Sequence, residues 1–297
     1  MAFLDQILER KKAEVDEAKK LRPLDDVKRM MRDAPPVVSF SDALSHGFGM
    51  IAEIKKRSPS AGEMRPENFT AAPAAYAQSP SVRAVSVLTN GPDFGMGIEE
   101  LSRVKALVAK PILRKDFIFE TYQVYEARAF GADALLLMAN VLDRDNMRRL
   151  FQLSRQLQMD VLFEAHTREE IESIPEGAKI YGINSRRFKA TGRWQLAKLL
   201  LLLGISNAAK GPDLSVELDT FSLIQHIPRD AIKVAESGVK PEKISEIMQL
   251  GYDAVLVGTS LLKAPEGIEK MLAQFERKLD QASPPSQPYG ANPAAPG

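Results

Sequence analysis

Lysine and glutamate side chains stand at the ends of several short apolar runs in this sequence. The polar residues at these positions are Glu53, Lys55, Lys115, Asp116, Glu164, Asn184 and Glu236. A buried, unpaired lysine or glutamate is costly, so several of them on one rim imply mutual pairing or a bound ligand. Burial lowers the pKa of a lysine and raises that of a glutamate, which suits both groups for proton transfer. These residues therefore predict acid–base chemistry carried by lysine and glutamate.

Glycine and serine follow the two last apolar runs, in Glu236-Ser237-Gly238 and in Gly258-Thr259-Ser260. Glycine lets backbone N–H groups approach an anion closely, and the N-terminus of a following helix adds a favourable dipole. Ser58, in the stretch KKRSPSAG, offers a further hydroxyl group. These stretches predict a phosphate site. The alternative is that the glycines only form tight turns between strand and helix.

The composition excludes several other chemistries. The 297 residues include 40 Lys+Arg, 39 Asp+Glu, 3 His and no Cys, for a net charge of +1. Without a one-sided basic surface, non-specific nucleic-acid binding is not expected. Without cysteine, the chain has no disulfide, no cysteine–zinc or iron–sulfur site and no thiol nucleophile. With only three histidines, a histidine-rich metal site is not expected, so catalysis must rest mostly on Lys, Glu, Asp, Asn, Ser and the backbone.

An alternation of strands and helices must position these residues. Eight apolar, β-branched runs predict strands at 50–55, 83–89, 111–116, 134–139, 161–166, 180–184, 232–237 and 254–258, and most are apolar enough to be buried on both faces. Helical patterns follow at 98–108, 121–130, 144–157, 167–174, 221–226 and 241–250. This alternation predicts a (β/α)8 TIM barrel, whose chemistry lies at the C-terminal ends of the strands. A doubly wound open sheet competes, but no Gly-rich dinucleotide loop follows the first strand.

The remaining segments flank or interrupt the barrel. Residues 1–48 predict a helical N-terminal extension packed on a catalytic barrel at 49–275, with Ser39 or Ser41 capping a helix. The sixth and seventh strands lie unusually far apart, which indicates an insertion at about 187–216 containing a leucine-rich helix. Residues 282–297 are rich in Pro, Gly, Ala and Ser and predict a disordered tail. The sequence shows no secretory signal and no apolar run of about 20 residues, so we expect a cytoplasmic protein with no membrane partner.

Each candidate residue also fits a purely structural role. Glu53 and Glu164 could form ion pairs inside the barrel, Lys115 could be a solvated rim charge, and Asn184 could belong to a turn. His166, two residues after Glu164, fits a loop or a helix cap better than a ligand role. Convergence of the whole set on one rim is harder to explain structurally, which favours an active site.

The sequence resembles the indole-3-glycerol-phosphate synthase family. The matching stretches are IAEIKKRSPSAG (51–62), LTNGPDF (88–94), PILRKDFI (111–118), GADALLLMA (131–139), FEAH (163–166), GINSR (182–186), ESGV (236–239) and VGTSLL (257–262). The resemblance implies a carbon–carbon lyase that needs no metal and no organic cofactor. Its substrate is a small phosphorylated molecule, 1-(2-carboxyphenylamino)-1-deoxyribulose 5-phosphate. The reaction closes a ring and loses CO2 and then water, giving indole-3-glycerol phosphate for tryptophan biosynthesis.

The resemblance also implies a role for each matching residue. Lys115 would be the general acid for ring closure, Glu164 an acid or base for the loss of the hydroxyl, and Lys55 the partner of the substrate carboxylate. Glu53 and Asn184 would position the substrate and support the lysines, and Ser237 belongs to the same pocket. The positions implied in binding phosphate are Ser58, Gly238, Gly258 and Ser260, while Phe94 and Leu136 would line the pocket for the aromatic ring.

Two departures from the family pattern leave alternatives open. Gly95-Met96-Gly97 replaces the usual residues after Phe94, and the 187–216 insertion follows the sixth strand on the same face. One alternative is another phosphosugar enzyme on this scaffold, such as a phosphoribosylanthranilate isomerase, although those enzymes usually rely on a cysteine base. The other is a catalytically silent phosphate-binding protein. The leucines of the insertion either pack on the barrel or form a contact in a homo-oligomer.

Overall fold

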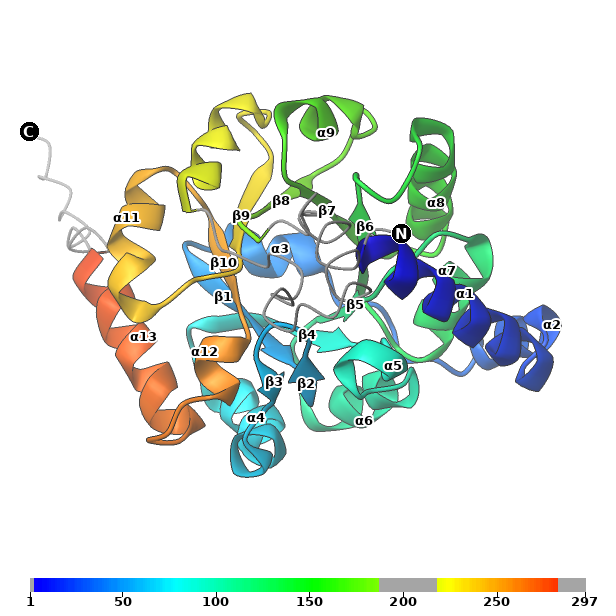
Figure 1. Cartoon of the computed structure of the whole chain (residues 1–297), viewed down its shortest axis with the longest axis horizontal. Coiled ribbons are helices and arrows are strands. Elements are labelled where there is room, and N and C mark those ends of the chain that lie inside the picture. The colour runs from blue at the N-terminus through cyan, green and yellow to red at the C-terminus, as the bar shows by residue number, and fades with distance from the viewer. Residues whose placement is uncertain (1–2, 187–217, 283–297) are drawn as a thin grey trace, which may run out of the picture.

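A closed barrel of eight parallel strands forms the centre of the molecule, as the sequence predicts (Figure 1). The structure is a computed structural model that describes residues 3–186 and 218–282. The barrel strands are β1 (Gly49–Ile54), β4 (Val82–Leu88), β5 (Ile112–Lys115), β6 (Ala134–Met138), β7 (Asp160–Ala165), β8 (Ile180–Asn184), β9 (Ile232–Glu236) and β10 (Ala254–Val257). Each pairs with its neighbour in chain order, and β10 closes the ring on β1.

Helices surround the barrel and bury their apolar faces on its outside (Figure 1). They are α4 (Pro66–Gln78), α6 (Glu99–Leu107), α7 (Thr121–Ala129), α8 (Arg144–Gln156), α9 (Arg168–Ser173), the 3₁₀ helices η1 (Leu218–His226) and η2 (Pro241–Lys243), α11 (Ile244–Gln249) and α13 (Ile268–Ala282). Local sequence sets their starts: the Asp143 side chain accepts a hydrogen bond from the Asn146 N–H, and that of Thr167 from the Glu170 N–H.

Successive strand residues alternate between the interior of the barrel and the surrounding helices. On β1, Ile51 belongs to the inner apolar cluster, whereas Ala52 and Ile54 pack outward against the helices. The inner cluster continues with residues such as Leu113 and Leu162. Because side chains alternate along a strand, the next inward position on each of these strands lies two residues closer to the C-terminal end. Those positions are the polar ones, which explains why charged residues end otherwise apolar strands.

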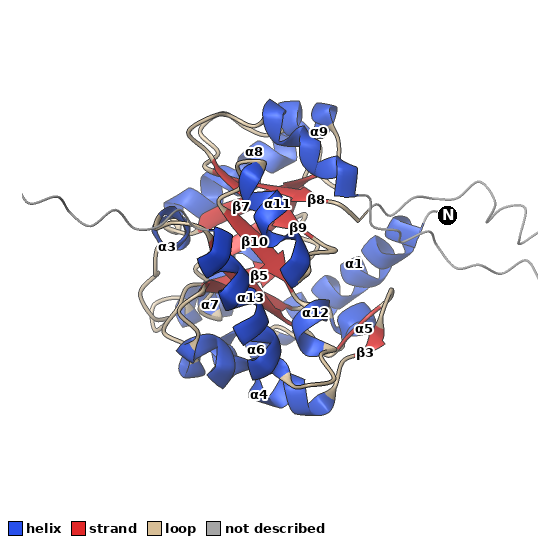
Figure 2. Cartoon of the chain, turned by 90° about the vertical axis from the view of Figure 1, so that its left-hand side faces the viewer, coloured by secondary structure: helices blue, strands red, loops and turns tan. Residues whose placement is uncertain are grey.

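The N-terminal extension covers both ends of the barrel. Helix α3 (Phe40–Ser45), capped by Ser39 as predicted, closes one end, where Phe40 and Leu44 join the inner cluster. Helix α1 (Phe3–Leu21) lies at the opposite end together with α5 (Gly91–Phe94) and the short strand β3 (Gly62–Glu63), as Figure 2 shows. Helix α2 (Leu24–Met30) lies between α1 and α3 in the chain. The extension is therefore packed on the barrel, with α1 on the face that carries the strand C-termini.

Some features differ from the sequence prediction. The loop after β1 forms a hairpin of β2 (Arg57–Ser58) and β3, followed by helix α4, and neither was expected. The helix expected at 221–226 is a 3₁₀ helix, η1, and α12 (Thr259–Leu262) is a single turn after β10. The predicted insertion at about 187–216 lies outside the described residues, and so does the predicted tail beyond Ala282. Within the described residues, no helix is long and apolar enough to cross a membrane.

Candidate active site

A cavity of about 280 Å³ opens at the C-terminal ends of the barrel strands. Its wall contains eleven of the twelve residues singled out from the sequence, namely Glu53, Lys55, Phe94, Lys115, Leu136, Glu164, Asn184, Ser237, Gly238, Gly258 and Ser260. The exception is Ser58, which lies in the β2–β3 hairpin. Its hydroxyl accepts a hydrogen bond from the Ala61 N–H at 3.2 Å, and the residue does not line the cavity. The structure thus brings together residues from all eight barrel strands or the loops that follow them.

One ammonium group sits between two buried carboxylates at the floor of the cavity. Lys115, at the end of β5, donates from Nζ to Oε2 of Glu164 at 3.2 Å and to Oε2 of Glu236 at 3.3 Å. Both carboxylates are only 1% exposed. Two carboxylates that share a buried site cannot both ionise easily, so the protonation state of each has to be considered.

The two carboxylates are pushed in opposite directions. Burial raises the pKa of Glu236, and repulsion by Glu164 adds to this against the attraction of Lys115, so that the pKa reaches about 8. For Glu164, burial also raises the pKa, but the attraction of Lys115 and His166 outweighs it and the net pKa lies below the ordinary value. Burial lowers the pKa of Lys115, yet the surrounding carboxylates raise it above its usual range. At neutral pH the site therefore holds a Lys115 ammonium, an ionised Glu164 and a largely protonated Glu236.

A second ion pair lies across the cavity from this group. Lys55, just after β1, donates from Nζ to Oε1 of Glu53, and both residues are buried. Burial raises the pKa of Glu53, but the attraction of Lys55 and Lys115 lowers it below its ordinary value. A Cβ atom on Gly258 would lie 2.3 Å from Glu53 Oε1, so glycine at this position makes room for the carboxylate. Glu53 is therefore paired directly with Lys55, and its negative charge also acts on Lys115.

A glycine also makes room for Glu236. A Cβ atom on Gly182 of β8 would lie 2.0 Å from Glu236 Oε1, closer than real Cβ contacts. Gly182 is the first residue of the stretch GINSR, and the structure explains why a glycine stands there: any side chain would collide with the Glu236 carboxylate. From the sequence, Glu236 is only one of several strand-end residues with no assigned role.

The loop after β8 adds a cation that the sequence did not single out. Arg186 lines the cavity, its backbone N–H donates to Oδ1 of Asn184 at 2.9 Å, and its Nη1 donates to Oγ of Ser60 at 2.5 Å. Burial lowers the pKa of Arg186 and attraction by Glu53 only partly opposes this. The signal that could have found it is its position, two residues beyond an inward-facing strand end.

The loops after β9 and β10 meet at one end of the cavity. Ser237 has φ 67° and Gly238 φ 65°, so two consecutive residues adopt the left-handed conformation. For serine this conformation costs roughly 1–2 kcal/mol, and it turns the backbone sharply beside the cavity. The hydroxyl of Ser260 donates to the carbonyl oxygen of Val239 at 2.7 Å, which ties the two loops together. This end of the cavity is glycine- and hydroxyl-rich, as an anion site requires.

Comparisons with known proteins bear on the identity of this site. A sequence model of the family described as indole-3-glycerol phosphate synthase matches residues 4–191 and 201–274. The chain belongs to the indole-3-glycerol phosphate synthase family. The enzymes of this family are carboxy-lyases of tryptophan biosynthesis. The match to the family is interrupted at 192–200, inside the stretch interpreted from the sequence as an insertion.

Curated relatives named indole-3-glycerol phosphate synthase match over most of their length. The protein of Thermoanaerobacter pseudethanolicus is 35% identical over 272 residues, which cover 90% of this chain and 95% of the relative. That of Mycobacterium ulcerans is 35% identical over 265 residues, covering 88% and 89%. Among solved structures, 3-hexulose-6-phosphate synthase from Salmonella typhimurium has a TM-score of 0.55 at 12% identity, covering 79% of this chain and 100% of that one. This last likeness concerns the barrel fold alone.

In this member of the indole-3-glycerol phosphate synthase family, the N-terminal helix reaches the residue next to Lys115. Lys11 of α1 is 1% exposed, and its Nζ lies 2.6 Å from Oδ2 of Asp116 and 3.1 Å from the Thr89 carbonyl oxygen. The same Asp116 oxygen accepts from Nη2 of Arg114 at 3.0 Å. A lysine and an arginine thus fix the backbone that follows β5 from behind, and with it the start of the Lys115 side chain.

Proposed function

We propose that this chain converts 1-(2-carboxyphenylamino)-1-deoxyribulose 5-phosphate to indole-3-glycerol phosphate, using Lys115, Glu164 and Glu236 for the proton transfers. The observation that carries the proposal is the Lys115 ammonium held between two buried carboxylates with opposite pKa displacements. Such a group contains a proton donor and a proton acceptor at the same pH, which is what a sequence of ring closure and dehydration needs.

Ring closure needs a proton on the substrate ketone when the aromatic carbon attacks it. Lys115 supplies this proton, because the carboxylates around it keep it in the ammonium form. An ammonium group at this place also stabilises the negative charge that develops on the ketone oxygen. Glu236 lies 3.3 Å from Lys115 Nζ and has a pKa of about 8, so it can return a proton to the amine that results.

Loss of CO2 restores electrons to the new ring, and loss of water then completes it. Glu164 is ionised before the reaction because Lys115 and His166 lower its pKa, so it can take up a proton. As the protonated acid, it can then deliver that proton to the departing hydroxyl. Glu164 thus acts first as a base and then as an acid, while Lys115 remains within hydrogen-bond distance.

The remaining cavity residues suit the other parts of the substrate. Lys55 faces the substrate carboxylate, with Glu53 and Asn184 holding the cations and the substrate in position. The apolar side chains of Phe94 and Leu136 line the wall where the aromatic ring would lie. The phosphate would occupy the end formed by Ser237, Gly238, Gly258 and Ser260. Ser58 is proposed as a further phosphate ligand, because its hydroxyl accepts one hydrogen bond and can still donate another.

The proposed activity needs a small-molecule substrate and no macromolecular partner. The family acts on a small phosphorylated substrate, and we propose this as the only ligand, with no nucleic acid and no membrane. A cytoplasmic location fits a biosynthetic enzyme of this kind. The proposed domain arrangement is the N-terminal extension, one catalytic barrel and an insertion at about 187–216. If the insertion mediates a homo-oligomer, its deletion will lower the mass measured by light scattering.

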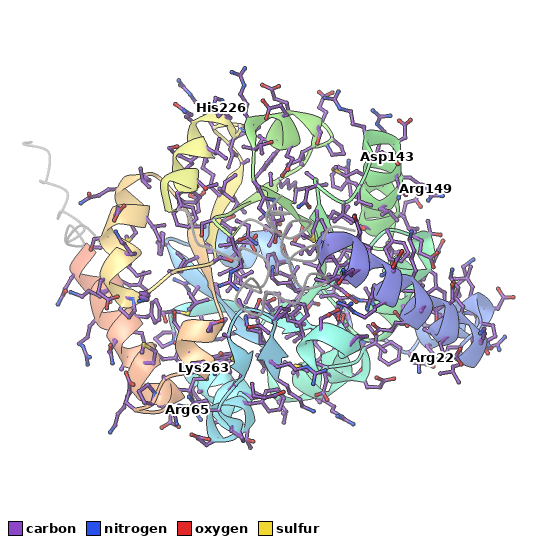
Figure 3. All side chains as sticks on the ribbon, in the orientation of Figure 1. Arg22, Arg65, Asp143, Arg149, His226 and Lys263 are labelled. Carbon is purple, nitrogen blue, oxygen red and sulfur yellow. The ribbon has the colours of Figure 1, made fainter. Side chains whose placement is uncertain are left out.

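The test is a turnover assay with a matched pair of lysine variants. We expect the purified protein to release indole-3-glycerol phosphate, followed by its fluorescence, in buffer containing a metal chelator. Lys115→Met should lower kcat by about 10² to 10⁴-fold, the range for loss of general acid catalysis. The control is Lys263→Met, because Lys263 lies on the outside of the barrel beside Arg65 (Figure 3). Absence of turnover by the folded wild-type protein would refute the proposed activity, and a near-normal kcat in Lys115→Met would refute the role of the lysine.

A further inference from the structure

His166 lies directly behind Glu164, and the chemistry derived above uses only its effect on the pKa of Glu164. It follows β7, is 4% exposed, and is not part of the cavity wall. Its Nε2 atom lies 3.6 Å from Oε1 of Glu164, the carboxylate oxygen that does not contact Lys115. Within residues 3–186 and 218–282, both Nε2 and this Oε1 are buried and lack a hydrogen-bond partner. Two orphaned polar atoms that face each other indicate an interaction that becomes complete in another protonation state.

The other nitrogen of the ring is fixed by α9. Nδ1 of His166 lies 3.2 Å from Oε2 of Glu170, and the backbone N–H of His166 donates to the same oxygen at 2.6 Å. An ionised carboxylate only accepts hydrogen bonds, so Nδ1 carries a proton and the ring orientation is set. Nε2 is therefore the nitrogen that gains or loses a proton, and it points toward Glu164.

The charges around the ring favour its protonated form. Glu164 on β7, Glu170 on α9 and Glu236 on β9 all act on His166, while Lys115 on β5 faces the far oxygen of Glu164. Burial lowers the pKa of His166, but the hydrogen bond with Glu170 and the attraction of these carboxylates outweigh it. The net pKa lies above the ordinary value. The ring is therefore available as a cation in the pH range where Glu164 must take up and release a proton.

We propose that His166 is a positioning residue that shares one proton with Glu164, between Nε2 and Oε1. When the proton moves to the carboxylate, an N–H bond breaks and an O–H bond forms. An imidazolium and a carboxylate then become a neutral imidazole and a carboxylic acid. The pair has zero net charge before and after this transfer, so the proton can shift between the two residues without creating a new buried charge. A closer approach of about half an ångström brings the two atoms into hydrogen-bond range.

This inference rests on the proposed function only for the acid–base role of Glu164. The first experiment measures protonation and does not depend on turnover. The chain has three histidines, so their ring signals can be titrated by NMR and that of His166 assigned by its loss in His166→Asn. We expect His166 to titrate above its ordinary value of 6.5, and its midpoint to fall by about one pH unit in Glu164→Gln, where the facing charge is absent. An unchanged midpoint in Glu164→Gln would overturn the proposal, even if the enzyme proved active.

The second experiment separates proton sharing from a structural tether between β7 and α9. His166→Gln can place an amide near the position of Nε2, but it cannot titrate. We expect kcat to fall about tenfold or more, with KM within about twofold because His166 does not line the cavity. Without the positive ring the pKa of Glu164 rises, so the acid limb of kcat should move to higher pH. The control is His226→Asn, since His226 lies on the outside of the barrel on η1 (Figure 3).

A structural tether gives a different result. If His166→Gln kept the wild-type kcat and pH profile, a simple hydrogen bond would suffice, and proton sharing would be refuted. If the variant lost stability, the NMR titration of Glu164→Gln would still decide the question, because that protein retains the histidine.

Discussion

Replacing Gly182 by alanine tests whether the position of Glu236 matters for catalysis. The backbone at Gly182 lies outside the left-handed region, so alanine itself causes no conformational strain. Its Cβ atom, however, would lie 2.0 Å from Glu236 Oε1, and real Cβ contacts under 3.0 Å essentially never occur. The carboxylate must therefore move by about 1 Å, the difference between these two distances. Because Glu236 now lies 3.3 Å from Lys115 Nζ, this shift is enough to break their hydrogen bond.

The expected cost is large for a change of one methyl group. A 1 Å misplacement in an active site can lower the rate by about 100-fold, equivalent to roughly 2.7 kcal/mol in the activation free energy. We expect a loss of this size in kcat for Gly182→Ala, measured by the fluorescence of the indole product. The overall fold should persist, because the methyl group meets the end of one side chain and the Leu162 side chain at 3.3 Å.

Two comparisons make the reasoning refutable. Gly97→Ala also creates a close contact, at 2.9 Å, but with the mobile end of the exposed Glu99 side chain, so it should leave kcat unchanged. In a Glu236→Ala background the clash disappears, so adding Gly182→Ala should have almost no further effect on kcat. If the two substitutions were instead additive, or if Gly182→Ala alone were fully active, the assigned position of Glu236 would be wrong.

Two further predictions concern stability. The pKa of Glu236 is about 8 in the folded protein, above its ordinary value of 4.5, so the folded state binds this proton more tightly than the unfolded state. Proton binding by Glu236 therefore stabilises the fold at low pH, and this stabilisation is lost as the pH rises through 8. Glu236→Gln has no such proton to lose. Its free energy of unfolding, measured by urea titration, should therefore rise relative to that of the wild type as the pH goes from 5 to 9. A difference between the two proteins that does not change with pH would contradict this. Lys11→Met should lower the free energy of unfolding by about 2 kcal/mol, since it removes a charged hydrogen-bond partner from buried Asp116. A loss below about 0.5 kcal/mol would show that Arg114, Thr89 and the Phe117 N–H together satisfy that carboxylate.

The sequence predicts all eight barrel strands, because each is a short, mostly apolar run, and several of these runs end in a polar residue. The same feature reveals the inward-facing groups: Glu53, Lys115 and Glu164 stand where the inward alternation reaches the open end of the barrel. What a sequence pattern cannot show is distance between segments. The contact of Lys11 with Asp116 joins residues 105 positions apart, and in the sequence Lys11 is one of many charges on an amphipathic helix.

Two other differences have local causes. Ser58 was expected at the phosphate site because of its motif, but it lies in the β2–β3 hairpin, outside the cavity wall, where its hydroxyl accepts a hydrogen bond from the backbone. Gly182 looked like an ordinary strand residue, because its importance depends on a carboxylate that β9 places beside it. The residue types needed for the chemistry are thus visible in the sequence, whereas the contacts that adjust their protonation become visible only in the structure.

The pairing of β1 with β10 joins the first and last strands of the barrel, and this seam passes through the cavity. Glu53, at one edge of the seam, has its carboxylate directly over Gly258, at the other edge. A nascent chain therefore carries most of its charged groups long before they can cooperate, since the last part of the wall is synthesised 200 positions after β1 ends. Enzymatic turnover consequently reports that the barrel has closed between β1 and β10. Two separately produced fragments of this chain, one with β1 and the other with β10, should become active only when they associate and these two strands pair.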